Sequence, residues 1–308
     1  MAAIEVDQLR KSYGDLDAVD GISFAVAEGE VYGLLGHNGA GKSTTVEILE
    51  GHRTATAGSV SVMGMNPVTS GRELRDRIGI VLQSSQVETE LTVREALRFY
   101  GSCYRRRRDI DDVIEMIGLT EKADERIGTL SGGQKRRIDL GLGIIGTPEV
   151  LFLDEPTTGF DPVARRQSWE LVQRLCDGGA TVLLTTHYLD EAEHLADRVG
   201  VLAGGRMVAE GTPDQLMSTV PDATISFDLP VGLRAADLGV PSSAEVDGST
   251  VNITTEVPTA ALAPIIAAAA DRGVELSNLS VRRPSLEDVF LRLGDGGDQV
   301  DGGNEVPR

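Results

Sequence analysis

The chain has 308 residues, of which 41% are hydrophobic and 25% charged, so it can bury a substantial core as one large domain plus a smaller one. Its formal net charge of −19 argues against binding to nucleic acid, which usually requires a clustered basic face. The one run of basic residues, Arg105 to Arg108, is expected to be a solvated face.

The sequence predicts neither a membrane-spanning segment nor a signal peptide. A spanning helix needs roughly 18 to 20 consecutive apolar residues, and the best candidate, Ala260 to Ala270, is short and interrupted by proline. The N-terminus lacks the basic start and apolar run of a signal peptide. Cys103 and Cys176 show no CxxC pairing and no companion histidine, which argues against a disulfide framework or a zinc site. We therefore expect a cytosolic protein with two reduced thiols.

Strands alternate with helices over the first two-thirds of the chain, and this order predicts an α/β fold with a mainly parallel core sheet. Three half-buried strands predict an additional antiparallel layer, at Ile4–Leu9, Gly21–Val26 and Gly58–Met63. Short apolar runs predict three buried central strands, at Val31–Leu35, Val150–Leu153 and Thr181–Leu184. Helical periodicity predicts a helical insertion at about 84–145. Together these elements predict a first domain at residues 1–215.

Residues 216–294 predict a small α/β accessory domain. Its expected strands and first helix are Thr224–Leu229, Thr250–Glu256, Glu275–Val281 and Thr259–Asp271. A second helix is expected after Pro284, since Ser285 and Asp288 can form a cap ahead of one apolar face, made of Leu286, Val289, Phe290 and Leu293. The acidic, glycine-rich tail at 295–308 has too few apolar groups to offset the entropy of ordering, so we expect it to be disordered.

A glycine-rich motif follows the first predicted central strand. The run GHNGAGKST fits GxxxxGK[ST] between a strand and a helix, which is the context of a phosphate-binding P-loop. Its backbone N–H groups can surround the β- and γ-phosphates of a nucleoside triphosphate, while Lys42 neutralises charge and Ser43 ligates Mg²⁺. The predicted nucleotide-binding residues are Gly36, Asn38, Gly39, Ala40, Gly41, Lys42, Ser43 and Thr44.

Two acidic residues end the second predicted central strand. Asp154 and Glu155 lie at the carboxyl end of the apolar run Val150–Leu153, the usual ligand edge of such a sheet. Asp154 is predicted to hold Mg²⁺, directly or through water. Glu155 is predicted to orient and polarise the water that attacks the γ-phosphate.

The run Leu130-Ser131-Gly132-Gly133-Gln134 closely resembles the LSGGQ signature of ATP-binding cassette (ABC) proteins. The resemblance covers Ala2 to about Leu216 and includes every expected element in chain order: Tyr13, the P-loop, Gln83, the signature, the paired acids, Asp161 and His187. His37 and Phe160 stand where the family more commonly has Pro and Leu, at positions where backbone geometry matters more than the side chain. The resemblance implies a P-loop NTPase fold of the ABC ATPase type, with ATP and Mg²⁺ as cofactors.

The resemblance also implies roles for the remaining motif residues. Two copies of the chain would pair head-to-tail in an ATP-dependent homodimer, each ATP lying between one P-loop and the other copy's signature. The signature residues that would contact ATP are Ser131, Gly132, Gly133 and Gln134. Tyr13 would stack on adenine, and Asp161 would align the site across the dimer interface. The predicted catalytic residues besides Glu155 are His187, which would bind the γ-phosphate, and Gln83, which would sense Mg²⁺ or water.

Two further segments are similar to ATPases of the drug-resistance subfamily, which includes daunorubicin exporters: Thr185–Arg198 and Pro284–Phe290. This similarity implies a separately encoded transmembrane permease, contacted by residues 83–97, and export of a drug, antibiotic or lipid-like substrate. The chain would then lie peripherally on the cytoplasmic face of the membrane. The alternative is a soluble ABC ATPase that acts as a nucleotide-dependent switch on ribosomes or DNA. The single P-loop and the net negative charge argue against it.

Overall fold

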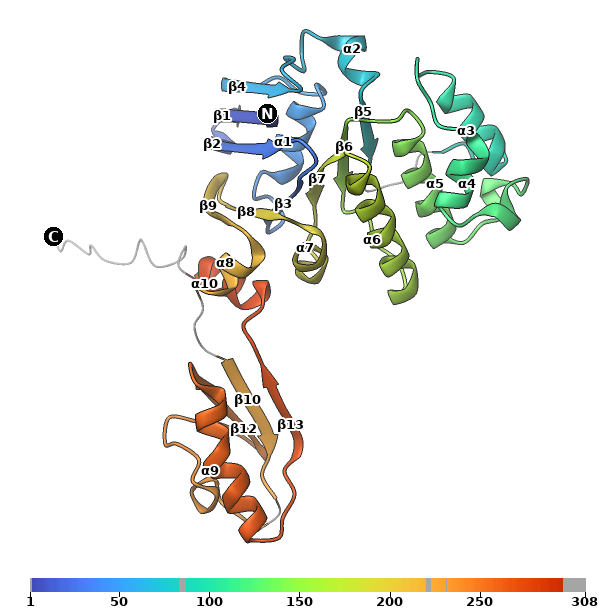
Figure 1. Ribbon diagram of the computed structural model, residues 1–308. Helices are drawn as coiled ribbons and strands as arrows, with labels where there is room; N and C mark the ends of the chain where they lie inside the picture. The colour runs from blue at the N-terminus through green and yellow to red at the C-terminus, as the bar shows by residue number, and fades with distance from the viewer. Residues whose placement is uncertain (1, 83–86, 220–222, 231, 296–308) are drawn as a thin grey trace, which may run out of the picture. The chain divides into compact units, whose positions relative to one another are not determined.

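The computed structural model describes residues 2–82, 87–219, 223–230 and 232–295 (Figure 1). It divides into two compact units, Met1–Pro213 and Asp214–Arg308. The boundary expected at 215/216 falls inside a short helix, α8 (Pro213–Met217), and the division lies at the start of that helix. The expected disordered tail lies almost wholly outside the described residues, since α10 runs from Leu286 to Asp295.

An antiparallel sheet forms the first layer of the first unit, with strand order β2-β1-β4. Its strands are β1 (Ala2–Tyr13), β2 (Leu16–Ala27) and β4 (Ala57–Val62). Alternate residues face the core, so Ile4 pairs with both Val26 and Val62 and all three side chains are buried. The predicted antiparallel layer is therefore confirmed. The strands β1 and β2 extend beyond the predicted ranges Ile4–Leu9 and Gly21–Val26.

A six-stranded sheet forms the centre of the same unit, in the order β5-β6-β7-β3-β8-β9. The strands are β5 (Ile78–Val81), β6 (Val150–Asp154), β7 (Thr181–Thr185), β3 (Val31–Gly36), β8 (Arg198–Ala203) and β9 (Arg206–Gly211). All neighbours are parallel except β8 and β9. The three predicted central strands are confirmed as β3, β6 and β7, whereas the β8–β9 hairpin was not predicted.

Side chains from both sheets and from helix α1 (Lys42–Leu49) form one hydrophobic cluster. Phe24 of β2 stacks on Tyr32 of β3 with ring centroids 5.2 Å apart, and Phe152 of β6 is fully buried in the same cluster. Helices α6 (Pro162–Asp177) and α7 (Leu189–Leu195) follow β6 and β7, and the short α2 (Gly71–Arg75) precedes β5. These helices pack on the core sheet through their buried apolar residues.

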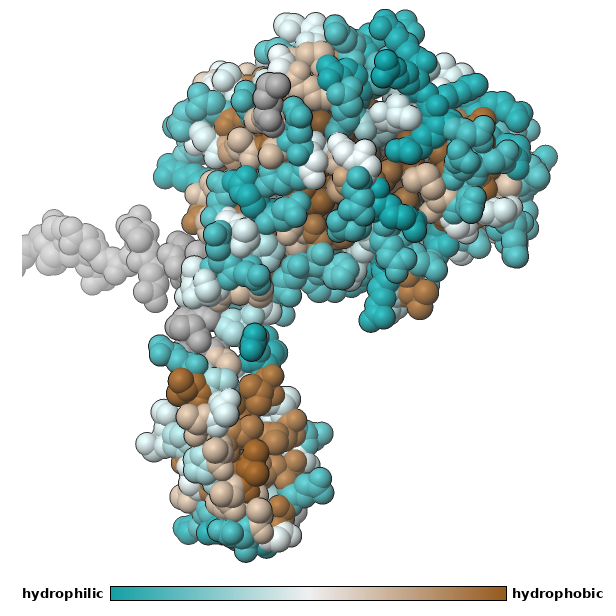
Figure 2. Space-filling view, in the orientation of Figure 1, coloured by the Kyte–Doolittle hydropathy of each residue, from teal (hydrophilic) through white to brown (hydrophobic). Residues whose placement is uncertain are grey.

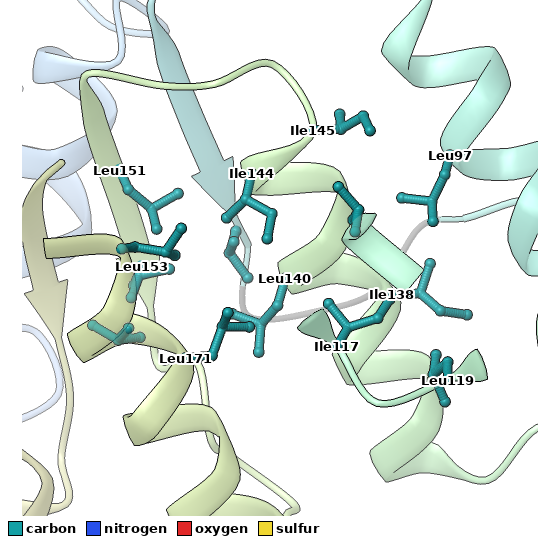
Figure 3. Close-up of a cluster of buried hydrophobic side chains, with 14 of the residues drawn as sticks. Leu97, Ile117, Leu119, Ile138, Leu140, Ile144, Ile145, Leu151, Leu153 and Leu171 are labelled. Atoms are coloured by element: carbon teal, nitrogen blue, oxygen red, sulfur yellow. The ribbon is translucent and has the colours of Figure 1, made fainter. Parts of the chain in front are cut away.

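The predicted helical insertion contains α3 (Val93–Gly101), α4 (Ile110–Met116) and α5 (Gly132–Ile144), with two short 3₁₀ helices at Thr120–Lys122 and Ile127–Thr129. A capping box formed by Thr92 and Glu95 begins α3. Figure 3 shows how α5 joins the insertion to the core sheet: Ile144 points toward Leu151 and Leu153 of β6, while Ile138 lies near Leu97. A second hydrophobic cluster therefore connects α5 both to the core sheet and to the other helices of the insertion.

The second unit is a four-stranded antiparallel sheet in the order β11-β12-β10-β13, with α9 (Pro258–Asp271) packed on it. Its strands are β10 (Ala223–Asp228), β11 (Glu245–Asp247), β12 (Thr250–Thr255) and β13 (Ser277–Arg282), and a 3₁₀ helix covers Ala235–Leu238. Asp288 accepts a hydrogen bond of 2.8 Å from the backbone N–H of Ser285 ahead of α10, as the predicted cap requires. Figure 2 shows apolar side chains gathered on one face of this unit.

Helix α5 lies unusually close to β5 at one pair of glycines. A Cβ built on Gly79 of β5 would lie 2.0 Å from the backbone oxygen of Gly143 of α5, and one on Gly143 would lie 2.6 Å from Val81. Backbone atoms cannot move aside as the end of a flexible side chain can. The approach of α5 to the core sheet therefore requires glycine at position 79, where the added Cβ would meet backbone, whereas at position 143 it would meet the Val81 side chain.

We predict that Gly79→Ala destabilises the protein by about 1–3 kcal/mol, because the added methyl group forces α5 away from β5. Thermal unfolding of the purified chain measures the effect. Gly132→Ala is the matched control, because no heavy atom lies within 4 Å of the Cβ it would add. Equal unfolding temperatures for the two variants would contradict the close-packing argument.

Candidate functional site

The loop between β3 and α1 has the backbone that phosphate binding requires. A Cβ on Gly36 would lie 2.5 Å from the backbone oxygen of Leu202, and one on Gly41 would lie 2.5 Å from that of Ala18. Gly39 and Gly41 have φ angles of +83° and +103°, which side chains rarely allow. Gly41 is the N-cap of α1 and supplies no side chain to cap it, so the first N–H groups of α1 remain available to an anion.

Lys42 lies beneath this loop with only 7% of its surface exposed. Its Nζ donates hydrogen bonds to the backbone oxygens of Gly36, at 2.6 Å, and His37, at 3.1 Å. Burial lowers the pKa of Lys42, and the nearby carboxylates of Glu155 and Asp154 oppose that shift. A buried cation held only by neutral carbonyls is well placed to neutralise a phosphate.

The two predicted acids lie at the carboxyl end of β6, directly beside the end of β7. Asp154 pairs in register with Thr185, whose hydroxyl donates a hydrogen bond to the Asp154 carboxylate. Glu155 has a φ of +47°, a conformation that is strained for a residue with a side chain. Its backbone N–H donates to the Thr185 oxygen at 2.9 Å. The end of β7 therefore fixes both acids.

The Glu155 carboxylate is largely buried and has two side-chain neighbours. Its Oε1 lies 3.0 Å from Nδ1 of His187, and its Oε2 accepts a hydrogen bond of 3.3 Å from the Thr158 hydroxyl. His187 follows β7 and is 44% exposed. The residue predicted to polarise the attacking water thus lies beside the residue predicted to bind the γ-phosphate.

The signature begins α5 and is open to solvent. The Ser131 hydroxyl accepts a hydrogen bond of 3.3 Å from the backbone N–H of Gln134, and Gln134 Oε1 accepts one of 2.9 Å from the backbone N–H of Ser131. This capping box occupies the Gln134 side chain, while Ser131 and Gly132 are exposed. No acidic residue lies in the first turn of α5, so its N-terminus can attract an anion.

Comparison with known proteins identifies the family. Residues 19–158 match the sequence profile of the ABC transporter family, and residues 223–285 match the C-terminal domain profile of ABC transporter domain-containing proteins. The chain is 41% identical over 306 residues to the daunorubicin resistance ATP-binding protein DrrA2 of Streptomyces coeruleorubidus, with 94% of each chain covered. The chain belongs to the ABC transporter family. As an ABC ATP-binding subunit, it binds and hydrolyses ATP.

Other ABC proteins agree with this identification. The chain is also 41% identical over 303 residues to the Nod factor export ATP-binding protein I of Rhizobium meliloti (strain 1021), covering 94% of this chain and 88% of that protein. Among solved structures, an ATP-binding subunit of an ABC transporter has a TM-score of 0.65 at 27% identity, covering 70% of this chain and 92% of that one. The structure of cbiO1 of Clostridium perfringens, part of the cbiONQ transporter complex, has a TM-score of 0.64 at 29% identity, covering 70% of this chain and 91% of that one. The predicted ABC ATPase fold is thus confirmed.

The remaining predicted site residues lie outside the P-loop, the acidic loop and the signature. Tyr13 ends β1 and is 41% exposed, with Nζ of Lys11 5.0 Å from its ring centroid. Asp161 is the N-cap of α6, where its carboxylate accepts hydrogen bonds from the backbone N–H groups of Val163 and Ala164 at 2.9 and 2.8 Å. Gln83 lies outside the described residues. Within the described part of the chain, no helix has the length and apolarity needed to cross a membrane.

Ser43 and Asp154 offer a hydroxyl and a carboxylate, both hard oxygen donors that suit Mg²⁺. Ser43 is exposed in the first turn of α1, and Asp154 is oriented by Thr185. An ion bound through one carboxylate, one hydroxyl, phosphate oxygens and waters is the arrangement that Mg²⁺ usually adopts. The residues present therefore fit the ion.

Sequence reasoning missed three groups that shape the site: Thr185, Thr158 and Arg136. The contacts of Thr185 and Arg136 join segments that are distant in sequence, so no spacing rule marks them. Thr158 lies only three residues after Glu155, in a loop with no periodic pattern. Arg136 was visible as part of the run that follows the signature, but a basic residue on a helix is more often solvent-exposed. Its burial, at 6% exposure, becomes apparent only in the folded chain.

A further carboxyl group is buried at the end of α1. Glu50 is 4% exposed, and burial, together with the charges of Asp154 and Glu47, raises its pKa to about 8. His52 lies nearby, with its Nδ1 3.2 Å from Glu50 Oε2. The folded chain therefore holds a proton on Glu50 more tightly than the unfolded chain does.

We predict that this group makes stability fall as the pH rises. Because the folded state binds the Glu50 proton more tightly, protonation of Glu50 stabilises the folded state, and this stabilisation is complete below the unfolded pKa of 4.5. It is lost as the pH rises toward the folded pKa of about 8. Glu50→Gln removes the titration, so its unfolding temperature should depend less steeply on pH than that of the wild type between about pH 5 and pH 8. Thermal unfolding across this range is the measurement, and parallel curves for the two proteins would contradict it.

Proposed function

We propose that this ABC subunit powers export of a drug, antibiotic or lipid-like compound through a separately encoded transmembrane permease. It would lie peripherally on the cytoplasmic face of the membrane. The names of the relatives, which refer to daunorubicin resistance and Nod factor export, support the direction and the substrate class. The observation that carries the hydrolytic mechanism is the strained, largely buried Glu155 beside His187.

Each residue of the site has a role in this proposal. Lys42 and the N–H groups of the P-loop bind the β- and γ-phosphates. Ser43 and Asp154 would hold Mg²⁺, which would supply positive charge to the phosphate oxygens. Glu155 accepts a hydrogen bond from the attacking water and polarises it, while His187 steadies the γ-phosphate and Gln83 contacts Mg²⁺ or water. The products are ADP and inorganic phosphate.

We further propose that two copies pair head-to-tail. The exposed N-terminus of α5 supports this arrangement, since a helix start without acidic residues in its first turn binds phosphate well. The partner's ATP would contact these residues and Gln134. Tyr13 would stack on adenine, and Asp161, at the start of α6, would align the partner's site across the interface.

The burial of individual side chains limits which part of the expected contact segment can touch the permease. Of the expected segment 83–97, Val93 and Leu97 are fully buried in the hydrophobic cluster of the insertion, so they are not free to touch another chain. The outer face of α3 is available, and Phe99 on it is 62% exposed. We propose that this face of α3 contacts the permease.

Glu155→Gln keeps the size of the side chain and its capacity for hydrogen bonds but removes its basicity. Because general-base assistance is worth about 10² to 10⁴ in rate, ATP hydrolysis should nearly stop while ATP binding persists. An ATP-loaded dimer should accumulate, and gel filtration should show an ATP-dependent shift to dimer mass that ADP does not cause. A folded variant that hydrolyses ATP within a few-fold of the wild type would exclude Glu155 and leave His187 as the leading candidate.

A second pair of variants separates the two halves of the site. Lys42→Ala should abolish tight ATP binding, because it removes the buried cation beneath the phosphates. Ser131→Arg should preserve ATP binding by the monomer and stop hydrolysis, because the signature acts only across the dimer. Nucleotide titration and a phosphate-release assay measure the two effects. Equal loss of binding in both folded variants would argue that both motifs serve one site within one monomer.

A further inference from the structure

Arg136 lies two residues beyond the signature, on the face of α5 that packs against the core sheet. Its side chain is 6% exposed. It forms an ion pair with Asp139, one turn further along α5, with Nη1 of Arg136 3.7 Å from Oδ2 of Asp139. Burial lowers its pKa, and the charges of Asp139, Asp154, Glu191 and Glu155 oppose the shift. Since an arginine in a protein stays protonated, α5 carries a buried positive charge directly behind the hydrolytic site.

The guanidinium group is held mainly by backbone oxygens. Its Nε donates to Pro156 at 2.9 Å, and its Nη2 donates to Asp154 at 3.0 Å and to Glu155 at 2.9 Å. Its Nη1 donates to the backbone oxygen of Leu82, at the end of β5. One side chain thus binds three consecutive carbonyls of the loop that carries the catalytic carboxylate, as well as the strand end that leads to residue 83.

Only arginine can make this set of contacts. Its planar fork carries five N–H donors in fixed directions, whereas lysine has three donors on one atom. The loop also needs support from its surroundings, because Glu155 has a φ of +47° and a strained conformation persists only where neighbours enforce it. Arg136 from one side and Thr185 from the other provide that support.

Helix α5 is rigidly attached to the strands that end at this site. Its C-terminal half lies against β5 through the close approach of Gly143 to Gly79, and Ile144 packs toward Leu151 and Leu153 of β6 (Figure 3). Its N-terminal end is exposed. A force applied at the signature is therefore resisted at the far end of α5 and transmitted through Arg136 to residues 154–156.

We propose that Arg136 is a positioning residue that couples the signature of one chain to Glu155 of the same chain. The inference rests on the proposed head-to-tail dimer, in which the signature contacts the partner's ATP. Arrival of that ATP fixes α5, Arg136 fixes the carbonyls beneath Glu155, and the carboxylate reaches its hydrolytic position over the chain's own ATP. Each site thereby senses whether the other is loaded, which gives cooperative hydrolysis.

Arg136→Lys in the full-length chain tests the proposal, and Arg137→Lys is the matched control. Arg137 is the next residue on α5 and donates to Gln167 Oε1 at 2.6 Å, away from the acidic loop. For Arg136→Lys we expect kcat to fall about 10- to 100-fold, as for a misplaced catalytic group, with the Kd for ATP unchanged and the Hill coefficient lowered toward one. Arg137→Lys should keep all three values. Arg136→Gln, which removes the buried charge, should show the same pattern as Arg136→Lys.

Single-turnover hydrolysis in the double variant identifies the route of the effect. If Arg136 acts through Glu155, adding Arg136→Lys to Glu155→Gln should cause no further loss of rate. A further loss, a normal kcat and Hill coefficient in Arg136→Lys, or a weakened Kd in step with a lower unfolding temperature would each overturn the proposal. Activity in Glu155→Gln alone would instead refute the proposed role of Glu155, so the two failures are distinguishable.

Discussion

The strand order β6-β7-β3 is the constraint on which the site depends. Because these neighbours are parallel, their carboxyl ends meet at one edge of the sheet, and the register pairs Asp154 with Thr185 and Thr185 with Leu34. The P-loop and the acidic loop therefore leave β3 and β6 at the same edge of the sheet, on either side of β7. Residues more than 110 positions apart in sequence, Lys42 and Glu155, are brought close enough for their charges to interact.

The two buried cations of this edge are stabilised in the same way. Lys42 donates to two carbonyls of the P-loop and Arg136 to four carbonyls of the strand ends. Carbonyl dipoles compensate part of the desolvation cost without neutralising the cation. The carboxylates of Asp154 and Glu155 consequently keep their capacity to bind a metal ion and a water, which direct ion pairs with these cations would reduce.

The sequence predicted the motifs, the three central strands and the antiparallel layer because each is encoded locally. It did not predict the β8–β9 hairpin, whose first strand joins the sheet through pairing with the distant β3. The contacts of Arg136, the burial of Glu50 and the placement of the boundary at Pro213 also depend on distant segments. No period or spacing reports them, because they arise from packing rather than from local propensity.

Helix α5 resolves a conflict between binding and stability. A helix start that receives a phosphate from another chain must stay exposed, yet a helix exposed along its length is marginally stable on its own. Here the capping box of Ser131 and Gln134 stabilises the exposed start without using the N–H groups of the whole first turn, and burial of Ile138, Leu140 and Ile144 anchors the remainder. Arg136 lies at the junction of these two parts. Through its hydrogen bonds to the carbonyls of Asp154 and Glu155, Arg136 joins the exposed start of α5 to the loop that carries the hydrolytic carboxylate.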